Sequence, residues 1–401
     1  MKKVSIVSVG TLPVPASNGG AVENIIENIV RENEIQKKLE LVVFSCYDQK
    51  SYELSKHYEF TKFEFVKIPR VIVILDKLIY RICGMMMSGT NLAFRYLLQR
   101  LYFIFIVSIR LRKSDFGNII LENHYTLYIV MLLWGNSRKY KNRYYYHMHN
   151  VMKTPWYLKE VIKKSNKFIG VSKYINSTLI SKGIVSESKF SVLKNKIDRD
   201  CFNIELKAIE RSKLRKKYQI PNENKIILFT GRLTKDKGIL ELLKAFKMLK
   251  DEKVSLLIVG SYFFKSDVAS PFEKEISRLI DNRVIFSGYV DYEEIPVLYN
   301  LSDFVVLPSI WNDPAPLTVI EALTSGKPLI TTNMGGIKEY ADDETSIIVD
   351  YNSNFIENLL IAIEKLLNNE EMTKELSKKA KEKTEFWTTS NYYNEFVDEI
   401  A

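Results

Sequence analysis

The segment from Trp311 to Glu339 constrains this chain of 401 residues more than any other part of its sequence. It holds two acids, Asp313 and Glu321, separated by two prolines and the start of an apolar helical pattern, and a strand pattern and a Gly-Gly pair follow. Amide groups at a helix start are free to bind oxygen atoms, and carboxylates accept hydrogen bonds from hydroxyl groups. The segment predicts a site for a polyhydroxylated, phosphate-bearing ligand. An ordinary αβ unit with a Pro loop is the alternative.

A basic motif lies between a predicted strand and a predicted helix earlier in the same half of the chain. Gly231 and Arg232 follow the strand, and Lys237 comes five positions after the arginine. The planar guanidinium and the lysine point charge can meet one diphosphate at a strand end. The spacing is not that of a Walker A loop. A basic loop that caps a helix is the alternative.

Strand and helix patterns alternate through both halves of the chain, which is typical of doubly wound α/β domains. We expect an N-terminal domain over residues 1–195 and a second domain over residues 196–385. The charged stretch from Lys194 to Asn224 is the best candidate for a linker. The region 71–113 is helical and apolar on most of its circumference. It predicts either core helices or a helix whose edge touches a membrane.

The two motifs together resemble the donor site of the retaining glycosyltransferases of family 4, which have the GT-B fold. The resemblance implies two Rossmann-like doubly wound domains that face each other across a cleft. It also implies that Arg232 and Lys237 stabilise the leaving diphosphate, that Asp313 contacts the donor sugar, and that Glu321 holds the ribose. The family usually has Glu where this chain has Asp313, so the shorter acid leaves the identity of the sugar open.

The same resemblance assigns further residues to the ligand. His149, at the end of a predicted strand, matches the family's histidine beside the sugar, and His124 is a second candidate. The C-terminal segment 386–401 resembles the helix that packs back on the N-terminal domain, although a last helix on the second domain fits as well. Lys196 stands where the family has glycine. The remaining residues expected to contact the donor are Gly19, Gly20, Gly231, Tyr289, Val290, Pro314, Ala315, Pro316 and Leu317.

The resemblance implies the reaction class. A sugar would move from a nucleotide diphosphate sugar, with a UDP-sugar favoured, to an acceptor hydroxyl with retention of the anomeric configuration. We expect no metal and no other cofactor, because two cations already serve the diphosphate and no ligand cluster stands out in the sequence. A nucleotide-sugar epimerase on the same fold and a non-catalytic subunit of a polysaccharide-assembly complex are the alternatives.

The net charge of +10 is unevenly distributed. Basic residues outnumber acidic ones two to one in the first 200 residues, whereas acidic residues are in excess in the rest. This asymmetry predicts that the N-terminal half faces an anionic membrane that carries a polyprenyl-diphosphate-linked saccharide acceptor, as in capsule assembly. A solvated lysine-rich surface is the alternative. No nucleic-acid partner is expected, because the basic excess forms no known reading motif.

Three scattered cysteines show no metal-binding spacing. The N-terminus lacks the pattern of a signal peptide, and the longest apolar run is too short to span a bilayer, which takes roughly 20 residues. We therefore expect a cytoplasmic protein, peripheral on the inner face of the cell membrane.

Overall fold

The computed structural model describes residues 1–86, 96–260, 271–288 and 290–400. The chain divides into two compact units, which are described separately. Unit 1 comprises Met1–Lys194 and Thr389–Ala401, and unit 2 comprises Asn195–Thr388.

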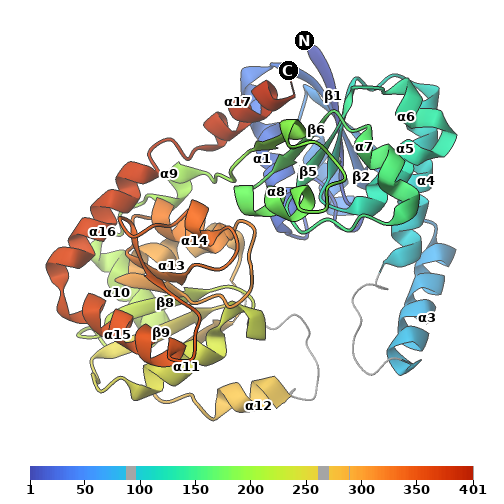
Figure 1. The fold of residues 1–401 in the computed structure, drawn as a ribbon. Helices are drawn as coiled ribbons and strands as arrows, with labels where there is room; N and C mark the ends of the chain where they lie inside the picture. Colours follow the sequence, from blue (N-terminus) through green and yellow to red (C-terminus); the bar gives the residue numbers. More distant parts are fainter. Residues whose placement is uncertain (87–95, 261–270, 289, 401) are drawn as a thin grey trace. The chain divides into compact units, whose positions relative to one another are not determined.

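Unit 1 contains a seven-stranded sheet in the order β3-β2-β1-β4-β5-β6-β7 (Figure 1). All neighbouring strands pair in parallel. The strands are β1 (Lys2–Val7), β2 (Leu39–Cys46), β3 (Thr61–Val66), β4 (Asn118–Glu122), β5 (Tyr144–Met148), β6 (Lys167–Gly170) and β7 (Phe190–Val192). The chain reverses its direction of winding between β1 and β4, which is where open α/β sheets bind ligands at their carboxyl ends.

Nine α-helices of unit 1 lie within the described residues. They are α1 (Ala21–Gln36), α2 (Gln49–Ser55), α3 (Arg70–Met86), α4 (Leu97–Lys113), α5 (Tyr128–Leu132), α6 (Asn136–Lys139), α7 (Lys159–Lys163), α8 (Lys173–Ile180) and α17 (Thr389–Glu399). The predicted helical region 71–113 is thus two helices, α3 and α4, and residues 87–95 lie outside the described residues.

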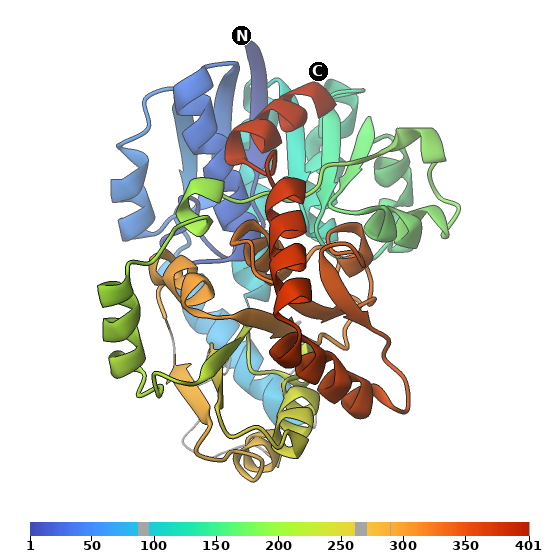
Figure 2. The ribbon, with the colours of Figure 1, turned by 90° about the vertical axis from the view of Figure 1, so that its left-hand side faces the viewer.

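The last helix of the chain belongs to unit 1. Helix α17 packs against α1 (Figure 2). Its Tyr392, Tyr393 and Phe396 are buried in the same apolar cluster as residues of β1, β2 and α1. The hydroxyl groups of Thr389 and Tyr393 donate to Glu32 and Asn33 of α1 at 2.6 and 2.5 Å. Apolar burial and these bonds together hold the C-terminal segment on the N-terminal sheet.

Unit 2 repeats the architecture with a six-stranded parallel sheet in the order β10-β9-β8-β11-β12-β13. The strands are β8 (Lys225–Thr230), β9 (Val254–Val259), β10 (Val284–Gly288), β11 (Phe304–Leu307), β12 (Leu329–Thr332) and β13 (Ser346–Val349). Continuous apolar runs such as VSLLIV in β9 are fully buried, as strands covered on both faces require. The winding reverses between β8 and β11, so the loops after these two strands meet at one edge of the sheet.

The helices of unit 2 are α9 (Arg199–Phe202), α10 (Ala208–Lys217), α11 (Ile239–Met248), α12 (Pro271–Ser277), α13 (Ile295–Leu301), α14 (Leu317–Thr324), α15 (Phe355–Asn368) and α16 (Glu370–Lys383). The predicted linker over Lys194 to Asn224 is wrong, because this stretch forms α9 and α10 and packs within unit 2. Arg211 of α10 donates to the carbonyl oxygens of Leu301 and Asn300 at 2.9 and 3.0 Å. The many charged residues of α10 made this helix look like a linker in the sequence.

Candidate active site

The basic motif forms the loop between β8 and α11. The Arg232 side chain is 53% exposed, and its Nη2 lies 4.0 Å from Oδ2 of Asp236. A short 3-10 helix, Lys235–Lys237, follows and ends at Gly238. This loop leaves the carboxyl end of a central strand, where a parallel sheet presents ligand-binding groups.

Lys237 joins the basic motif to the segment that follows β11. Its Nζ donates to Oδ2 of Asp313 at 2.6 Å, and both side chains are largely buried. The other carboxylate oxygen, Oδ1, accepts from the Ala315 amide at 3.3 Å. The Asp313 carbonyl oxygen accepts from the Gly336 amide at 2.8 Å. Two motifs that are 76 residues apart therefore meet in one ion pair with fixed geometry.

A pocket opens beside this ion pair, in unit 2. Its wall includes the start of α14. There the Val319 and Ile320 amides donate to the Pro316 carbonyl oxygen, and the amides of Leu317 and Thr318 come before this first bonded turn. Its polar lining residues are Thr230, Lys237, Ser309, Asp313 and Thr318. An ion pair of a lysine and a carboxylate, several hydroxyl groups and helix-start amides in one pocket suit a ligand that carries both phosphate and hydroxyl groups.

Glu321 lies inside α14 and is 4% exposed. Its Oε1 accepts from the Tyr292 hydroxyl at 3.1 Å, and its Oε2 accepts from the Tyr299 hydroxyl at 3.0 Å. Burial raises the pKa of Glu321 from its ordinary value of 4.5 to about 7, although both hydroxyl groups act to lower it. The Glu321 carboxylate thus already accepts two hydrogen bonds within the protein. The contact between Glu321 and the ribose stays a prediction.

The raised pKa of Glu321 makes the stability of the fold depend on pH. Because the folded state keeps this proton longer than the unfolded state, the free energy of unfolding should fall as pH rises from 4.5 to about 7. The contribution of this one group is about 3 kcal/mol. Glu321→Gln should remove it, so urea unfolding of the variant should show a flatter pH dependence than that of the parent protein.

The exposed acid Glu344 of the same unit is a matched control for this measurement. Glu344→Gln should give a pH dependence parallel to that of the parent protein. If the Glu321→Gln curve also runs parallel to the parent curve, Glu321 does not titrate in this range.

The other donor-site residues predicted in unit 2 surround the turn that enters α14. Pro314 and Pro316 have no amide hydrogen to donate, and the Ala315 amide already bonds Asp313, so among these four residues the amide of Leu317 is left for a ligand. Val290 packs against the core of unit 2. Tyr289 lies outside the described residues.

The predicted glycine loop lies between β1 and α1 of unit 1. Gly19 and Gly20 have φ of +69° and +112°. A Cβ at Gly20 would lie 2.3 Å from Oε2 of Glu23, so only glycine lets this carboxyl group lie against the loop. Burial, and to a smaller extent the charge of Glu122, raises the pKa of Glu23 to about 7.

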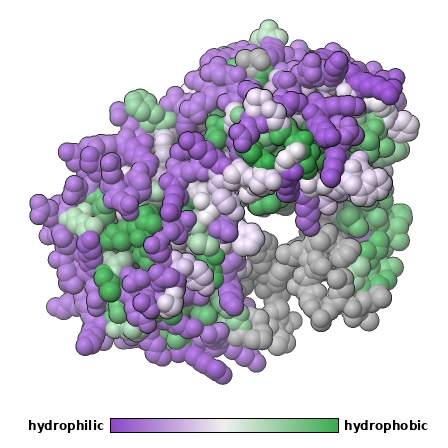
Figure 3. Space-filling model, in the orientation of Figure 1, coloured by the Kyte–Doolittle hydropathy of each residue, from purple (hydrophilic) through white to green (hydrophobic). Residues whose placement is uncertain are grey.

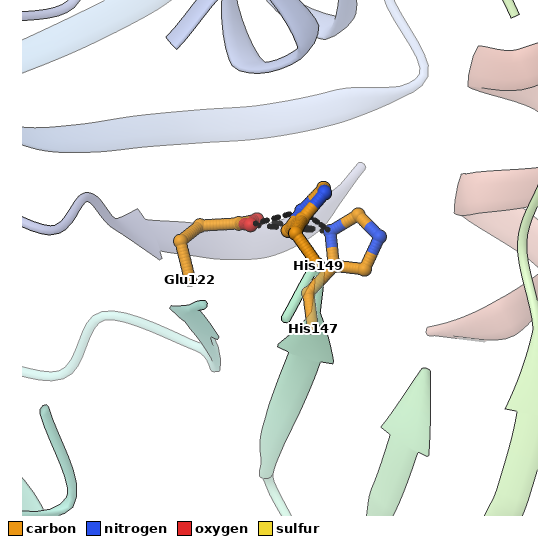
Figure 4. A group of neighbouring side chains, drawn as sticks. All are labelled: Glu122, His147 and His149. Atoms are coloured by element: carbon orange, nitrogen blue, oxygen red, sulfur yellow. Dashed lines mark hydrogen bonds and ion pairs between the residues drawn. The ribbon is translucent and has the colours of Figure 1, made fainter. Parts of the chain in front are cut away.

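His149 also lies in unit 1, directly after β5, and points toward Glu122 and His147 (Figure 4). All three residues are buried. Burial lowers the pKa of His149 to about 4. Burial alone would raise the pKa of Glu122, but His147 and His149 lower it to about 2. A contact between His149 and a sugar stays a prediction, because its Nε2 is already engaged within the protein.

His124, the second histidine candidate, has other partners. Its Nε2 accepts from Nη1 of Arg100 at 3.0 Å, and its Nδ1 lies 2.7 Å from Oγ1 of Thr126. The charge of Arg100 and, more strongly, burial lower the pKa of His124 to about 4. His124 is thus held as a neutral hydrogen-bond acceptor away from the cluster that Glu122 forms with His147 and His149.

Sequence reasoning missed Glu122, Tyr292 and Tyr299. Glu122 pairs in register with His147 across β4 and β5. An acid at the end of one predicted strand and a histidine at the end of the next could therefore have indicated this contact. The two tyrosines lie in the segment before β11, and no short-range spacing relates them to Glu321. Tertiary packing alone brings these hydroxyl groups to the acid.

Comparison with known proteins supports a ligand-binding site in unit 2. Residues 210–383 match the family described as glycosyl transferases group 1. An uncharacterised glycosyltransferase of Methanocaldococcus jannaschii is 32% identical over 193 residues, which are 48% of this chain and 48% of that protein. The capsular polysaccharide biosynthesis glycosyltransferase CapM of Staphylococcus aureus is 28% identical over 248 residues, 58% of this chain and 62% of CapM. The chain thus matches about half of the length of these curated relatives.

Solved structures resemble the whole chain. The crystal structure of HepE from Anabaena in complex with UDP and glucose gives a TM-score of 0.74 at 18% identity, and the match covers 99% of both chains. At this identity the likeness shows the fold. The expected fold class is confirmed as two doubly wound parallel-sheet domains of the GT-B type, and residues 210–383 match the glycosyl transferases group 1.

Proposed function

We propose that this protein is a retaining glycosyltransferase of family 4 that transfers a sugar from a UDP-sugar to a lipid-linked saccharide in surface polysaccharide biosynthesis. The observation that carries the proposal is the Lys237–Asp313 ion pair beside the pocket at the start of α14. It brings a cation for phosphate and an acid for sugar hydroxyls into one pocket, within the region that matches glycosyl transferases group 1.

The chemistry follows from where charge develops. As the bond between the anomeric carbon and the diphosphate oxygen breaks, negative charge builds on the diphosphate, and in this proposal Lys237, Arg232 and the amides at the start of α14 stabilise that charge. The acceptor oxygen then bonds the anomeric carbon on the same face, and its proton passes to the departing phosphate. This route needs neither a protein general base nor a metal ion for the transfer itself.

Ligand-induced stabilisation followed by product analysis tests the proposal. We expect UDP and one UDP-sugar to raise the melting temperature, since a ligand at 100 times its dissociation constant stabilises by about 2.7 kcal/mol. With a polyprenyl-diphosphate saccharide present, the product should keep the anomeric configuration of the donor by NMR. Free nucleotide with an epimerised sugar would instead indicate an epimerase, and no stabilisation by any nucleotide would contradict the donor site.

We also propose that unit 1 binds the anionic inner face of the cell membrane, and α3 supports this partner. One face of α3 exposes apolar side chains at helical spacing, and hydrophobic atoms lie at the surface there (Figure 3). The exposed apolar residues are Val71, Ile74, Leu75, Leu78 and Ile82. Arg70, Lys77 and Arg81 border this face and are exposed. An apolar stripe with basic residues at its edge suits the boundary between acyl chains and anionic headgroups. Among the described residues, no helix is long and apolar enough to cross a membrane.

Placing acids on the apolar face of α3 should weaken membrane binding. Burying each of these side chains in the acyl boundary contributes about 1.5–3 kcal/mol, so Ile74→Glu combined with Leu78→Glu should weaken binding to phosphatidylglycerol vesicles at least tenfold. Co-sedimentation at low and high salt measures this. Ile361→Glu is the matched control, since Ile361 of α15 is 60% exposed and Ile74 is 65% exposed. Equal loss in both variants, or no binding by the parent protein, would favour a soluble acceptor.

A further inference from the structure

Three potential metal ligands converge at the carboxyl ends of β4 and β5. Glu122 is level with His147 in the parallel register, and His149 lies two residues further along, on the same side of the chain as His147. The three side chains point toward one point in unit 1 (Figure 4). Among the described residues they form a group of ligand atoms that all lie within 4.8 Å of one another.

The contacting atoms form a nearly equilateral triangle. Nε2 of His149 lies 3.1 Å from Oε2 of Glu122 and 3.2 Å from Nδ1 of His147, and that Nδ1 lies 3.2 Å from the same Oε2. A zinc ion holds histidine nitrogen and carboxylate oxygen at about 2.0–2.2 Å in a tetrahedron, which places neighbouring ligand atoms about 3.3 Å apart. The triangle therefore already has the dimensions of one face of a zinc tetrahedron.

The surroundings of the triangle favour a cation. Glu122 is 1% exposed, and the ion pairs of its carboxylate are with His147 and His149, which carry positive charge only when protonated. Glu23, a second buried acid, is close enough to feel the charge of Glu122. Burying carboxylates without a permanent cation is costly, and a divalent ion would supply two positive charges.

We infer that Glu122, His147 and His149 bind one divalent transition-metal ion of the zinc type, with three protein ligands and a fourth position left open. Two imidazoles and one carboxylate are a ligand set that zinc sites of this kind use. Such an ion would join the carboxyl ends of β4 and β5. This assigns Nε2 of His149 to the metal in place of the sugar contact that the sequence resemblance implies.

Hydrogen bonds alone are the competing explanation of the triangle. If Nδ1 of His147 and Nε2 of His149 each carry a hydrogen, both can donate to Oε2 of Glu122 at the same distances. In that case Nε2 of His147 would be an acceptor without a partner, as it is in this structure. The two explanations differ in whether the protein retains a metal ion.

Metal binding by the full-length protein distinguishes them. After dialysis against a chelator, titration with Zn²⁺ should give one ion per chain by calorimetry and raise the melting temperature. Co²⁺ in its place should give the visible absorption of tetrahedral cobalt without a thiolate charge-transfer band, which separates this site from one built on the three cysteines. No stoichiometric binding by the parent protein would overturn the proposal and leave a hydrogen-bonded cluster.

Substitutions of the proposed metal-ligating residues test where the ion binds. Altering residues that only support zinc ligands costs about 10–100-fold in affinity, so removing a ligand in Glu122→Gln or His147→Gln should cost at least about a hundredfold. His57→Gln is the matched control, because His57 is an exposed histidine of the same unit. Circular dichroism confirms that each variant is folded. Affinity unchanged in a folded Glu122→Gln variant would place the ion elsewhere and contradict the assignment.

Discussion

Lys237→Ala should lower turnover by at least about a hundredfold at saturating donor. Removing one preorganised group that stabilises transition-state charge costs about 10²–10³-fold, and Lys237 is the cation at the pocket. The substitution also removes the partner of the largely buried Asp313 carboxylate. The loss should therefore appear in kcat with a donor-saturated enzyme, measured as product formed per unit time.

Two further variants test whether the expected loss is specific to Lys237. Arg232→Ala should show a loss of the same order, since its guanidinium is proposed to meet the same diphosphate. Lys235→Ala is the matched control, because this exposed lysine lies on the same 3-10 helix two residues before Lys237. Turnover unchanged in Lys237→Ala, or reduced equally in Lys235→Ala, would contradict the role of Lys237 at the leaving group.

The fold was largely predictable because its signals are local. Strands β9, β11 and β12 coincide with short apolar runs of the sequence, since buried parallel strands are apolar runs bounded by turn residues. The stretch over α9 and α10 was mistaken for a linker because α10 is charged on most of its surface and buries little apolar area. Its packing depends on Arg211 reaching carbonyl oxygens that lie about 90 residues away, which no local pattern reveals.

The part of the candidate site that lies within short sequence motifs was predictable. The motifs around Lys237 and Asp313 each indicate a ligand on their own, and the structure adds that they meet in an ion pair. The tyrosines on Glu321 and the carboxylate beside His149 were not predictable, because they come from other elements. Their contacts are consequences of sheet register and core packing rather than of spacing along the chain.

Gly238→Ala should disrupt the Lys237–Asp313 ion pair that joins the two motifs and should destabilise unit 2. Gly238 has φ of +71°, and a Cβ there would lie 1.9 Å from the carbonyl oxygen of Pro308, directly after β11. The left-handed conformation costs about 1–2 kcal/mol for a residue with a Cβ, and overpacking against backbone adds about 1–3 kcal/mol. We expect a loss of about 2–5 kcal/mol in the free energy of unfolding, measured by urea denaturation.

The close approach of Gly238 also positions Lys237. The Asp236 carbonyl oxygen accepts from the Ile310 amide at 3.0 Å. The basic loop is therefore hydrogen-bonded to the segment after β11 just before Lys237, and it lies close against Pro308 just after Lys237. Forcing Gly238 away from Pro308 would pull Lys237 from Asp313, and turnover should fall even in the fraction that remains folded.

Gly183→Ala is the matched control for Gly238→Ala. Gly183 has φ of +61°, and a Cβ added there would have no other atom within 4 Å. This substitution should cost only the backbone term of about 1–2 kcal/mol and leave turnover unchanged. Equal effects of the two substitutions would show that backbone conformation alone, and not the contact with Pro308, requires glycine at position 238.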